Sequence, residues 1–206
     1  MRESRSQVCK EGTIMAKSKA MTLRGSFDMT VGRATAYGAS TAAHVFSYDS
    51  VDRTRAWRVT YASVWLQELL HGTGGGDSRA MCQWTLSTES LGDVTITTGP
   101  TAREWERRMG AGDNRNMAWS ATDYQTRENV DADFLVPAIA GQPPMLLDVD
   151  RLVTNELWIH AFGVTEGSAT LSLQANYYIE MELIKITSSE SVLQQLKGQG
   201  QSVGDP

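Results

Sequence analysis

The strongest pattern in the chain is an unbroken alternation of apolar and polar residues from 169 to 183. The apolar positions of this run share one parity, and they are Ala169, Leu171, Leu173, Ala175, Tyr177, Ile179, Met181 and Leu183. Successive side chains of a strand point to opposite faces, so the run predicts one long strand with a buried and a solvated face. The parity reverses after Leu183, which predicts a β-bulge or a change of packing partner near that residue.

A second long alternation runs from Met21 to Val31 and predicts a matching strand. Shorter alternating runs follow at 57–65, 79–87, 93–97 and 117–122, and residues 157–164 are apolar on both parities. The last run therefore predicts a strand that is covered on both faces. Four tryptophans lie on apolar parities and are expected in the core or in subunit contacts: Trp57, Trp65, Trp84 and Trp119. Eight or more strands separated by Gly, Pro and Asn turns favour an all-β sandwich or barrel.

Helical patterns are scarce. Residues 101–109 are compatible with two turns that begin at Thr101. A second short helix is predicted at 190–197, with Ser188 or Ser189 as its N-cap and Gly198 at its end. Its apolar face consists of Val192, Leu193 and Leu196. The polar residues 199–206 are expected to form a flexible tail.

Length and composition indicate one domain of 206 residues with a sizeable core. No stretch approaches the roughly 18 apolar residues of a membrane span, and no signal peptide is recognisable, so neither a membrane partner nor secretion is expected. The two cysteines, Cys9 and Cys82, do not suggest a disulfide framework. Cys82 lies on the apolar parity of its strand and is expected to be a buried free thiol.

Charge is distributed unevenly along the chain. Residues 1–24 carry a net charge of +4 in a chain whose total is −5, so a weakly basic arm precedes an acidic body. The cations of this arm are Arg2, Arg5, Lys10, Lys17, Lys19 and Arg24. Such an arm either contacts nucleic acid phosphates or is an ordinary solvated terminus. Met15 also looks like a natural start, which would make residues 1–14 an upstream extension.

Patterns that carry catalytic chemistry are missing from the sequence. His44, His71 and His160 are widely spaced and form no HxH or HExxH motif. The glycine-rich residues 72–76 lack the Lys-Ser/Thr of a phosphate-binding loop, and no GxSxG nucleophile elbow is present. We therefore expect a protein that is not an enzyme and that has no catalytic residues, cofactor or metal site.

Five segments together resemble the single jelly-roll capsid proteins of small circular single-stranded DNA viruses, the type that also encodes a replication initiator. These segments are MAKSKAMTL (15–23), DNRNMAW (113–119), ELWIHA (156–161), NYYIEMELIKI (176–186) and SESVLQQL (189–196). The resemblance implies a coat subunit with eight strands in two facing sheets. Many such proteins begin with an arginine-rich arm, whereas this arm has few arginines, so genome packaging through it is an open question.

The expected organisation is a weakly basic arm (1–20), a single jelly-roll β-sandwich domain with short helices (21–198) and a flexible tail (199–206). The predicted function is a viral coat protein that assembles with copies of itself into an icosahedral shell in the virion and encloses genomic nucleic acid. Residues expected at assembly contacts are Trp158, Phe162, Val192, Leu193 and Leu196. The alternative is a non-catalytic β-sandwich module that binds a ligand such as a carbohydrate.

Overall fold

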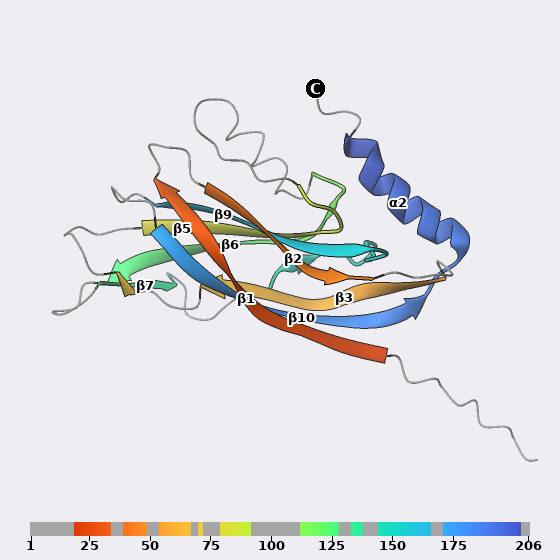
Figure 1. Cartoon of the computed structure of the whole chain (residues 1–206), viewed down its shortest axis with the longest axis horizontal. Coiled ribbons are helices and arrows are strands. Elements are labelled where there is room, and N and C mark those ends of the chain that lie inside the picture. The colour runs from red at the N-terminus through yellow and green to blue at the C-terminus, as the bar shows by residue number, and fades with distance from the viewer. Residues whose placement is uncertain are drawn as a thin grey trace, which may run out of the picture.

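The computed structural model describes residues 19–33, 39–48, 54–66, 70–71, 79–91, 112–127, 133–137, 144–165 and 171–202. Two layers of strands make up most of this structure, and one helix stands at an end of it (Figure 1). The elements are β1 (Lys19–Arg33), β2 (Ala39–Ser47), β3 (Arg55–Leu66), β4 (Leu70–His71), β5 (Arg79–Ser87), β6 (Asn116–Arg127), β7 (Asp133–Pro137), β8 (Leu146–Leu147), β9 (Glu156–Thr165), β10 (Leu171–Lys185) and α2 (Ser188–Ser202).

The strand order is that of a jelly-roll β-sandwich, as predicted. One layer contains β3, β10 and β1, and the other contains β2, β9, β5, β6, β7 and β4. The chain passes between the layers from β1 to β2, from β2 to β3 and again from β9 to β10. Residues 144–153 run beside β3, where Met145 N–H donates to Ala62 O at 2.9 Å and Val153 forms a bridge with Trp57. This segment therefore borders the first layer in the place of a fourth strand.

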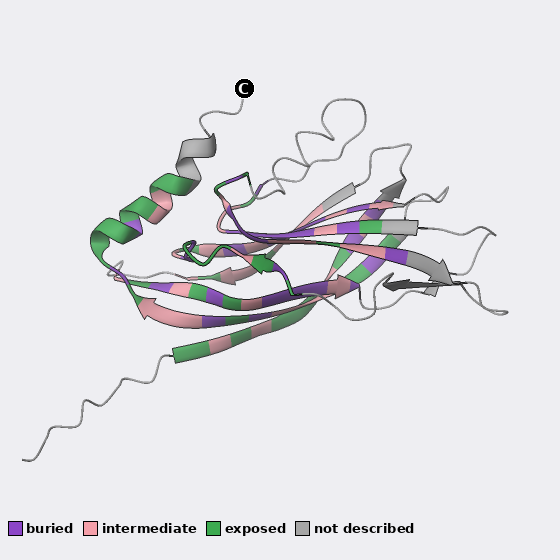
Figure 2. Cartoon of the chain, turned by 180° about the vertical axis from the view of Figure 1, so that it is seen from behind, coloured by how far each residue is buried: buried purple, intermediate pink, exposed green. Residues whose placement is uncertain are grey.

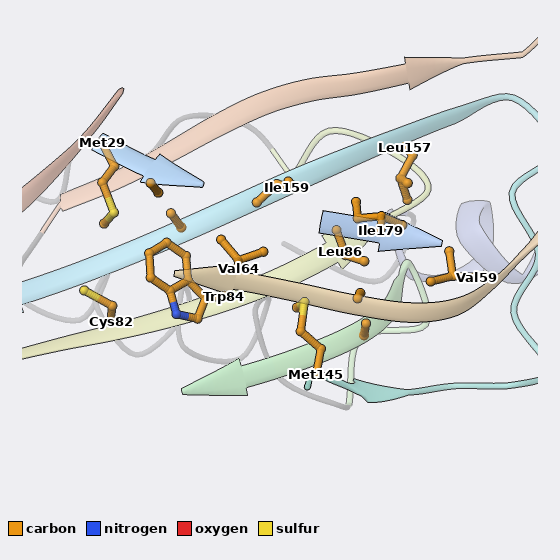
Figure 3. Packing of buried hydrophobic residues seen from close by; sticks show 14 of the residues in the cluster. Met29, Val59, Val64, Cys82, Trp84, Leu86, Met145, Leu157, Ile159 and Ile179 are labelled. Carbon is orange, nitrogen blue, oxygen red and sulfur yellow. The ribbon is translucent and has the colours of Figure 1, made fainter. Parts of the chain in front are cut away.

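The core lies between the two layers and is built from the apolar parities of their strands (Figure 3). Trp84 of β5 is fully buried at its centre, among side chains such as Val64 of β3 and Ile159 of β9. Cys82 is a buried free thiol, as expected, and burial raises its pKa to about 12. The thiol is therefore protonated at neutral pH and behaves as a small apolar side chain.

The two long alternations of the sequence pair with each other. β1 and β10 are antiparallel in one continuous register, from Lys19 opposite Leu183 to Val31 opposite Leu171. Leu23 lies opposite Ile179 on the core side, whereas Arg24 lies opposite Tyr178 on the outer side. The parity change predicted near Leu183 is explained by a second small cluster, in which Ile184 and Ile186 pack with Ala56 and Leu152.

A β-bulge in β3 changes which of its aromatic residues face the core. The β3–β10 register shifts between Glu180 and Met181, so that Thr60 and Tyr61 both lie opposite Glu180. Trp57 consequently shares the core side with buried Val59, whereas Tyr61 and Trp65 lie on the outer side. The predicted single apolar parity for 57–65 is therefore wrong beyond Thr60.

Four strands of the fold were not predicted from the sequence, namely β2, β7 and the two-residue strands β4 and β8. The strand predicted at 93–97 and the helix predicted at 101–109 lie outside the described residues. The apolar run 157–164 is β9, in which Leu157 and Ile159 face the core and His160, on the other parity, is also fully buried. The prediction that this strand is covered on both faces is correct at its centre.

Gly163 of β9 provides a test of how closely the two layers approach each other. A Cβ placed there would lie 2.8 Å from Val31 Cγ2 and 3.2 Å from the Val31 backbone, near the point where β1 and β9 pair. Gly163→Ala should therefore lower the free energy of unfolding by about 1–3 kcal/mol through overpacking. Gly112→Ala, with no atom within 4 Å of the new Cβ, should change it by less than about 0.5 kcal/mol. Equal denaturation midpoints for the two variants would contradict this account.

Candidate assembly surface at the C-terminal helix

Helix α2 begins in a capping box formed by Thr187 and Glu190. Glu190 N–H donates to Thr187 Oγ1 at 3.2 Å, and Thr187 N–H donates to Glu190 Oε2 at 2.7 Å. These bonds also hold the pKa of Glu190 below its usual value. The N-cap is therefore Thr187, one residue before the predicted Ser188 or Ser189. The motif T-x-x-E was present in the sequence and was missed because two serines follow it.

The helix is longer than predicted and passes through Gly198 to end at Ser202. Residues 199–202, assigned from the sequence to a flexible tail, are thus helical. A glycine in a helix costs only about 1 kcal/mol relative to alanine, so neither Gly198 nor Gly200 need end it.

The apolar face of α2, formed by Val192, Leu193 and Leu196, points away from its own sandwich. These side chains are 45%, 58% and 54% exposed, whereas Ser191 on the opposite side is buried (Figure 2). The described part of the chain therefore leaves about half of each of these side chains exposed. We call these three residues the apolar helix face.

Arg151 explains this orientation, because it attaches the polar side of α2 to the loop before β9. Its Nη1 donates to Gln194 O at 3.2 Å and its Nη2 donates to Thr88 Oγ1 at 2.9 Å. Gln194 Nε2 in turn donates to Asp150 O at 2.8 Å. Arg151 is buried, and burial lowers its pKa, but the carboxylates of Glu89, Asp148 and Asp113 oppose that shift. A buried cation surrounded by acceptors fixes the helix more rigidly than apolar contact alone.

An ion pair supports the loop beneath the helix. Arg115 and Asp113 form a fork in which Arg115 Nη2 donates to Asp113 Oδ2 at 2.6 Å and Arg115 Nε donates to Oδ1 at 3.0 Å. A small hollow of about 130 Å³ is lined by Asp113 of this pair, by Arg151 and by Lys197 of the helix.

The outer face of β9 carries the other two predicted assembly residues. Trp158 and Phe162 are half-buried, and Trp158 Nε1 donates to Glu156 Oε2 at 2.9 Å. The ring centroid of Trp158 is 6.4 Å from that of His160 on the same strand. It is 4.7 Å from that of His44, which lies on β2 and is distant in sequence. Strand pairing of β2 with β9 brings them together, and nothing in the sequence spacing indicated it.

The basic arm lies mostly outside the described residues. Arg2, Arg5, Lys10 and Lys17 fall there, as does Cys9. Lys19 and Arg24 lie on β1 and are exposed. Only Lys19 and Arg24 of the six cations are thus described, and contact with nucleic acid stays a prediction.

Among the described residues, no group of three or more His, Cys, Asp or Glu side chains is arranged to hold a metal ion. Within the same residues, no helix is both long and apolar enough to cross a membrane.

Comparison with known proteins found solved structures with a similar fold at low sequence identity. No family model and no curated protein matches the sequence. The structure of Mud crab tombus-like virus is 9% identical, covering 95% of this chain and 97% of that chain at a TM-score of 0.35. VP1 of Trichodysplasia spinulosa-associated polyomavirus, in complex with GM1 oligosaccharide, is 8% identical, covering 84% and 98% at 0.40. The decameric BFDV capsid protein is 13% identical, covering 82% and 99% at 0.33. Each likeness concerns the jelly-roll fold alone.

His160 provides a test of the buried polar cluster. Leu91 N–H donates to its Nε2 at 3.3 Å, and burial lowers its pKa to about 4. In the unfolded chain His160 takes up a proton as the pH falls through about 6.5, whereas in the folded chain it stays neutral until about pH 4. The free energy of unfolding therefore falls as the pH drops from about 6.5 to about 4. The loss due to His160 should approach about 3 kcal/mol.

Urea denaturation of wild type and His160→Gln at several pH values isolates this contribution, because all other groups titrate in both proteins. The wild type should lose more stability than the variant between pH 6.5 and 4. Parallel pH profiles would show that His160 is not held neutral by burial.

Proposed function

We propose that this chain is a viral coat subunit that assembles with copies of itself into an icosahedral shell around a small single-stranded DNA genome. The observation that carries the proposal is the apolar helix face, which the subunit builds and orients but leaves uncovered. It agrees with the resemblance of the sequence to jelly-roll capsid proteins. In this role the protein is located in the virion and has no catalytic function.

The apolar helix face is a preformed contact element. An isolated helix of fifteen residues is only marginally stable in water, so its order depends on the capping box and on the Arg151 attachment. Both devices use polar bonds and leave Leu193 and Leu196 free for another surface. Such an element loses little conformational freedom on binding, which favours association.

The energetic scale suits a shell. Burial of each of these side chains contributes about 1.5–3 kcal/mol at most, so a single contact of this size is weak. Val149, in the loop to which α2 is attached, is also exposed, at 68%. In a closed symmetric assembly every subunit repeats the contact, and weak contacts together stabilise the whole shell.

The outer face of β9 is proposed as a second contact region. Trp158 and Phe162 offer apolar area that is only half covered within the subunit. Aromatic residues are enriched at the centres of protein interfaces, which supports this assignment. The basic arm is proposed to contact the enclosed nucleic acid, since Lys19 and Arg24 continue its positive charge onto β1.

Assembly is tested with Leu193→Asp combined with Leu196→Asp. Both side chains are exposed in the subunit, so its fold and thermal stability should persist while each contact gains buried, unpaired charge. Particle yield, measured by size-exclusion chromatography and electron microscopy, should fall at least tenfold.

Ser189→Asp is the control, because it adds one negative charge at an exposed polar position of the same helix and should leave assembly intact. Truncation after Thr187 should likewise give a folded β-rich subunit that does not assemble. Particles of normal size and yield from the double variant would refute the role of the helix face.

The arm is tested by deleting residues 1–18, which leaves β1 complete. Nucleic acid that co-purifies with the protein should decrease. The slope of log affinity against log salt for single-stranded DNA should become shallower by about 0.7 for each phosphate that the shortened protein no longer neutralises. Equal absorbance ratios and equal salt slopes for both proteins would identify the arm as a solvated terminus.

A further inference from the structure

The outer face of the β3–β10–β1 layer contains a hollow that assembly through α2 does not use. Its volume is about 450 Å³, within the range of ~300–1,000 Å³ typical of small-molecule sites. The residues that line it are Tyr61, Ser63, Trp65, Tyr178 and Glu180. It lies on the side of this layer that faces away from the core.

The bulge at Thr60 gives the hollow its aromatic character. Because Thr60 and Tyr61 both lie opposite Glu180, the residues beyond the bulge reverse their faces, and Tyr61 and Trp65 turn outward. Without this extra residue both rings would lie on the same side as Val59, in the core. The bulge thus places large aromatic side chains on an otherwise polar sheet surface, at the expense of core packing.

The aromatic rings are paired but remain accessible. Tyr61 and Tyr178 meet edge to face, with ring centroids 5.9 Å apart and an interplanar angle of 71°. Both rings and that of Trp65 are half-buried, and no described side chain closes the hollow over them. Rings held in this way offer flat apolar surfaces for a ligand with flat apolar faces of its own.

Hydrogen-bonding groups surround these rings. Tyr178 Oη donates to Glu180 Oε1 at 2.8 Å, and this bond raises the pKa of Tyr178, so its hydroxyl stays protonated at neutral pH. An ionised carboxylate accepts several hydrogen bonds, so Glu180 can accept ligand hydroxyls as well. Asn176 lies opposite Trp65 in the register, and Arg24 lies opposite Tyr178.

The hollow itself is unsuited to a polyanion, because Glu180 is the only charged residue among the described residues that line it. On the outer positions nearby, Arg58 is paired with Glu182 at 3.3 Å, and the other charged residues are Arg24, Asp28 and Glu180. Binding of single-stranded nucleic acid requires a positively charged groove beside its stacking residues, and the hollow lacks one.

We propose that the hollow binds an uncharged saccharide. The C–H faces of a sugar ring would stack on Trp65 and Tyr61, while its hydroxyls would bond with Glu180, Ser63 and Tyr178. The apolar C–H faces of the sugar thus meet the aromatic rings, and its hydroxyls meet the hydrogen-bonding groups. An apolar ligand would leave the hydrogen-bonding groups unused, and a polyanion would be repelled by Glu180. This site is independent of the proposed assembly through α2.

The test uses the full chain and a panel of cellohexaose, maltohexaose and xylohexaose, with heparin and (dT)10 as polyanionic probes. Calorimetric titration should detect at least one neutral oligosaccharide. Trp65→Ala should weaken its affinity roughly tenfold because the sugar can no longer stack there, and Glu180→Gln and Tyr178→Phe should weaken it less. Tyr178→Phe keeps the ring and should not disturb folding. Weaker binding by this variant therefore tests the site even if Trp65→Ala fails to fold.

Gln174→Ala is the matched control. Gln174 is exposed on the outer face of β10, the strand that carries Tyr178 and Glu180, but it does not line the hollow. The affinity of this variant should equal that of the wild type. No binding of any neutral oligosaccharide, binding that Trp65→Ala leaves unchanged, or Trp65-dependent binding of (dT)10 or heparin instead would overturn the proposal. Particle yield plays no part in this readout, so its outcome is separate from that of the assembly test.

Discussion

The structure depends above all on the pairing of β1 with β10. Two strands of fifteen residues each hold one register along their shared length, so the apolar parities of the two strands, to which Leu23 and Ile179 belong, are directed to the same side. A shift by one residue would move the whole apolar set of a strand into water, which makes this register costly to change. Tyr177 even lies over Gly25, where a Cβ would come within 2.7 Å of its hydroxyl oxygen.

Three features of the structure are organised by this pair. The core face meets the second layer around Trp84, the outer face contains the aromatic hollow, and the end of β10 leads through Ile186 into the capping box of α2. The hollow and the apolar helix face therefore occupy different parts of the molecule. Self-association through one is compatible with ligand binding at the other.

Buried polar groups determine how the end of the sandwich is built. Arg151 and His160 are both almost fully buried, and each is held by hydrogen bonds rather than by apolar contact. Arg151 keeps its charge because carboxylates lie nearby, whereas burial keeps His160 neutral. Removal of one member of such a cluster leaves its partners unsatisfied, so the orientation of α2 is specified by polar bonds and not by its own leucines.

The sequence by itself determined the two long strands, most of the shorter ones, the burial of Cys82 and the existence of a helix after β10, because side-chain alternation and capping are local properties of the chain. The jelly-roll arrangement came from the resemblance to capsid proteins and was confirmed by the strand order. Only the tertiary structure decided that Tyr61 and Trp65 face outward, since a bulge is defined by the register against the neighbouring strand. It also decided that Leu193 and Leu196 are exposed, because the bond that fixes the helix comes from Arg151, 43 residues before Gln194. A helical pattern identifies an apolar face, but the partner that turns this face toward or away from the core lies elsewhere in the chain.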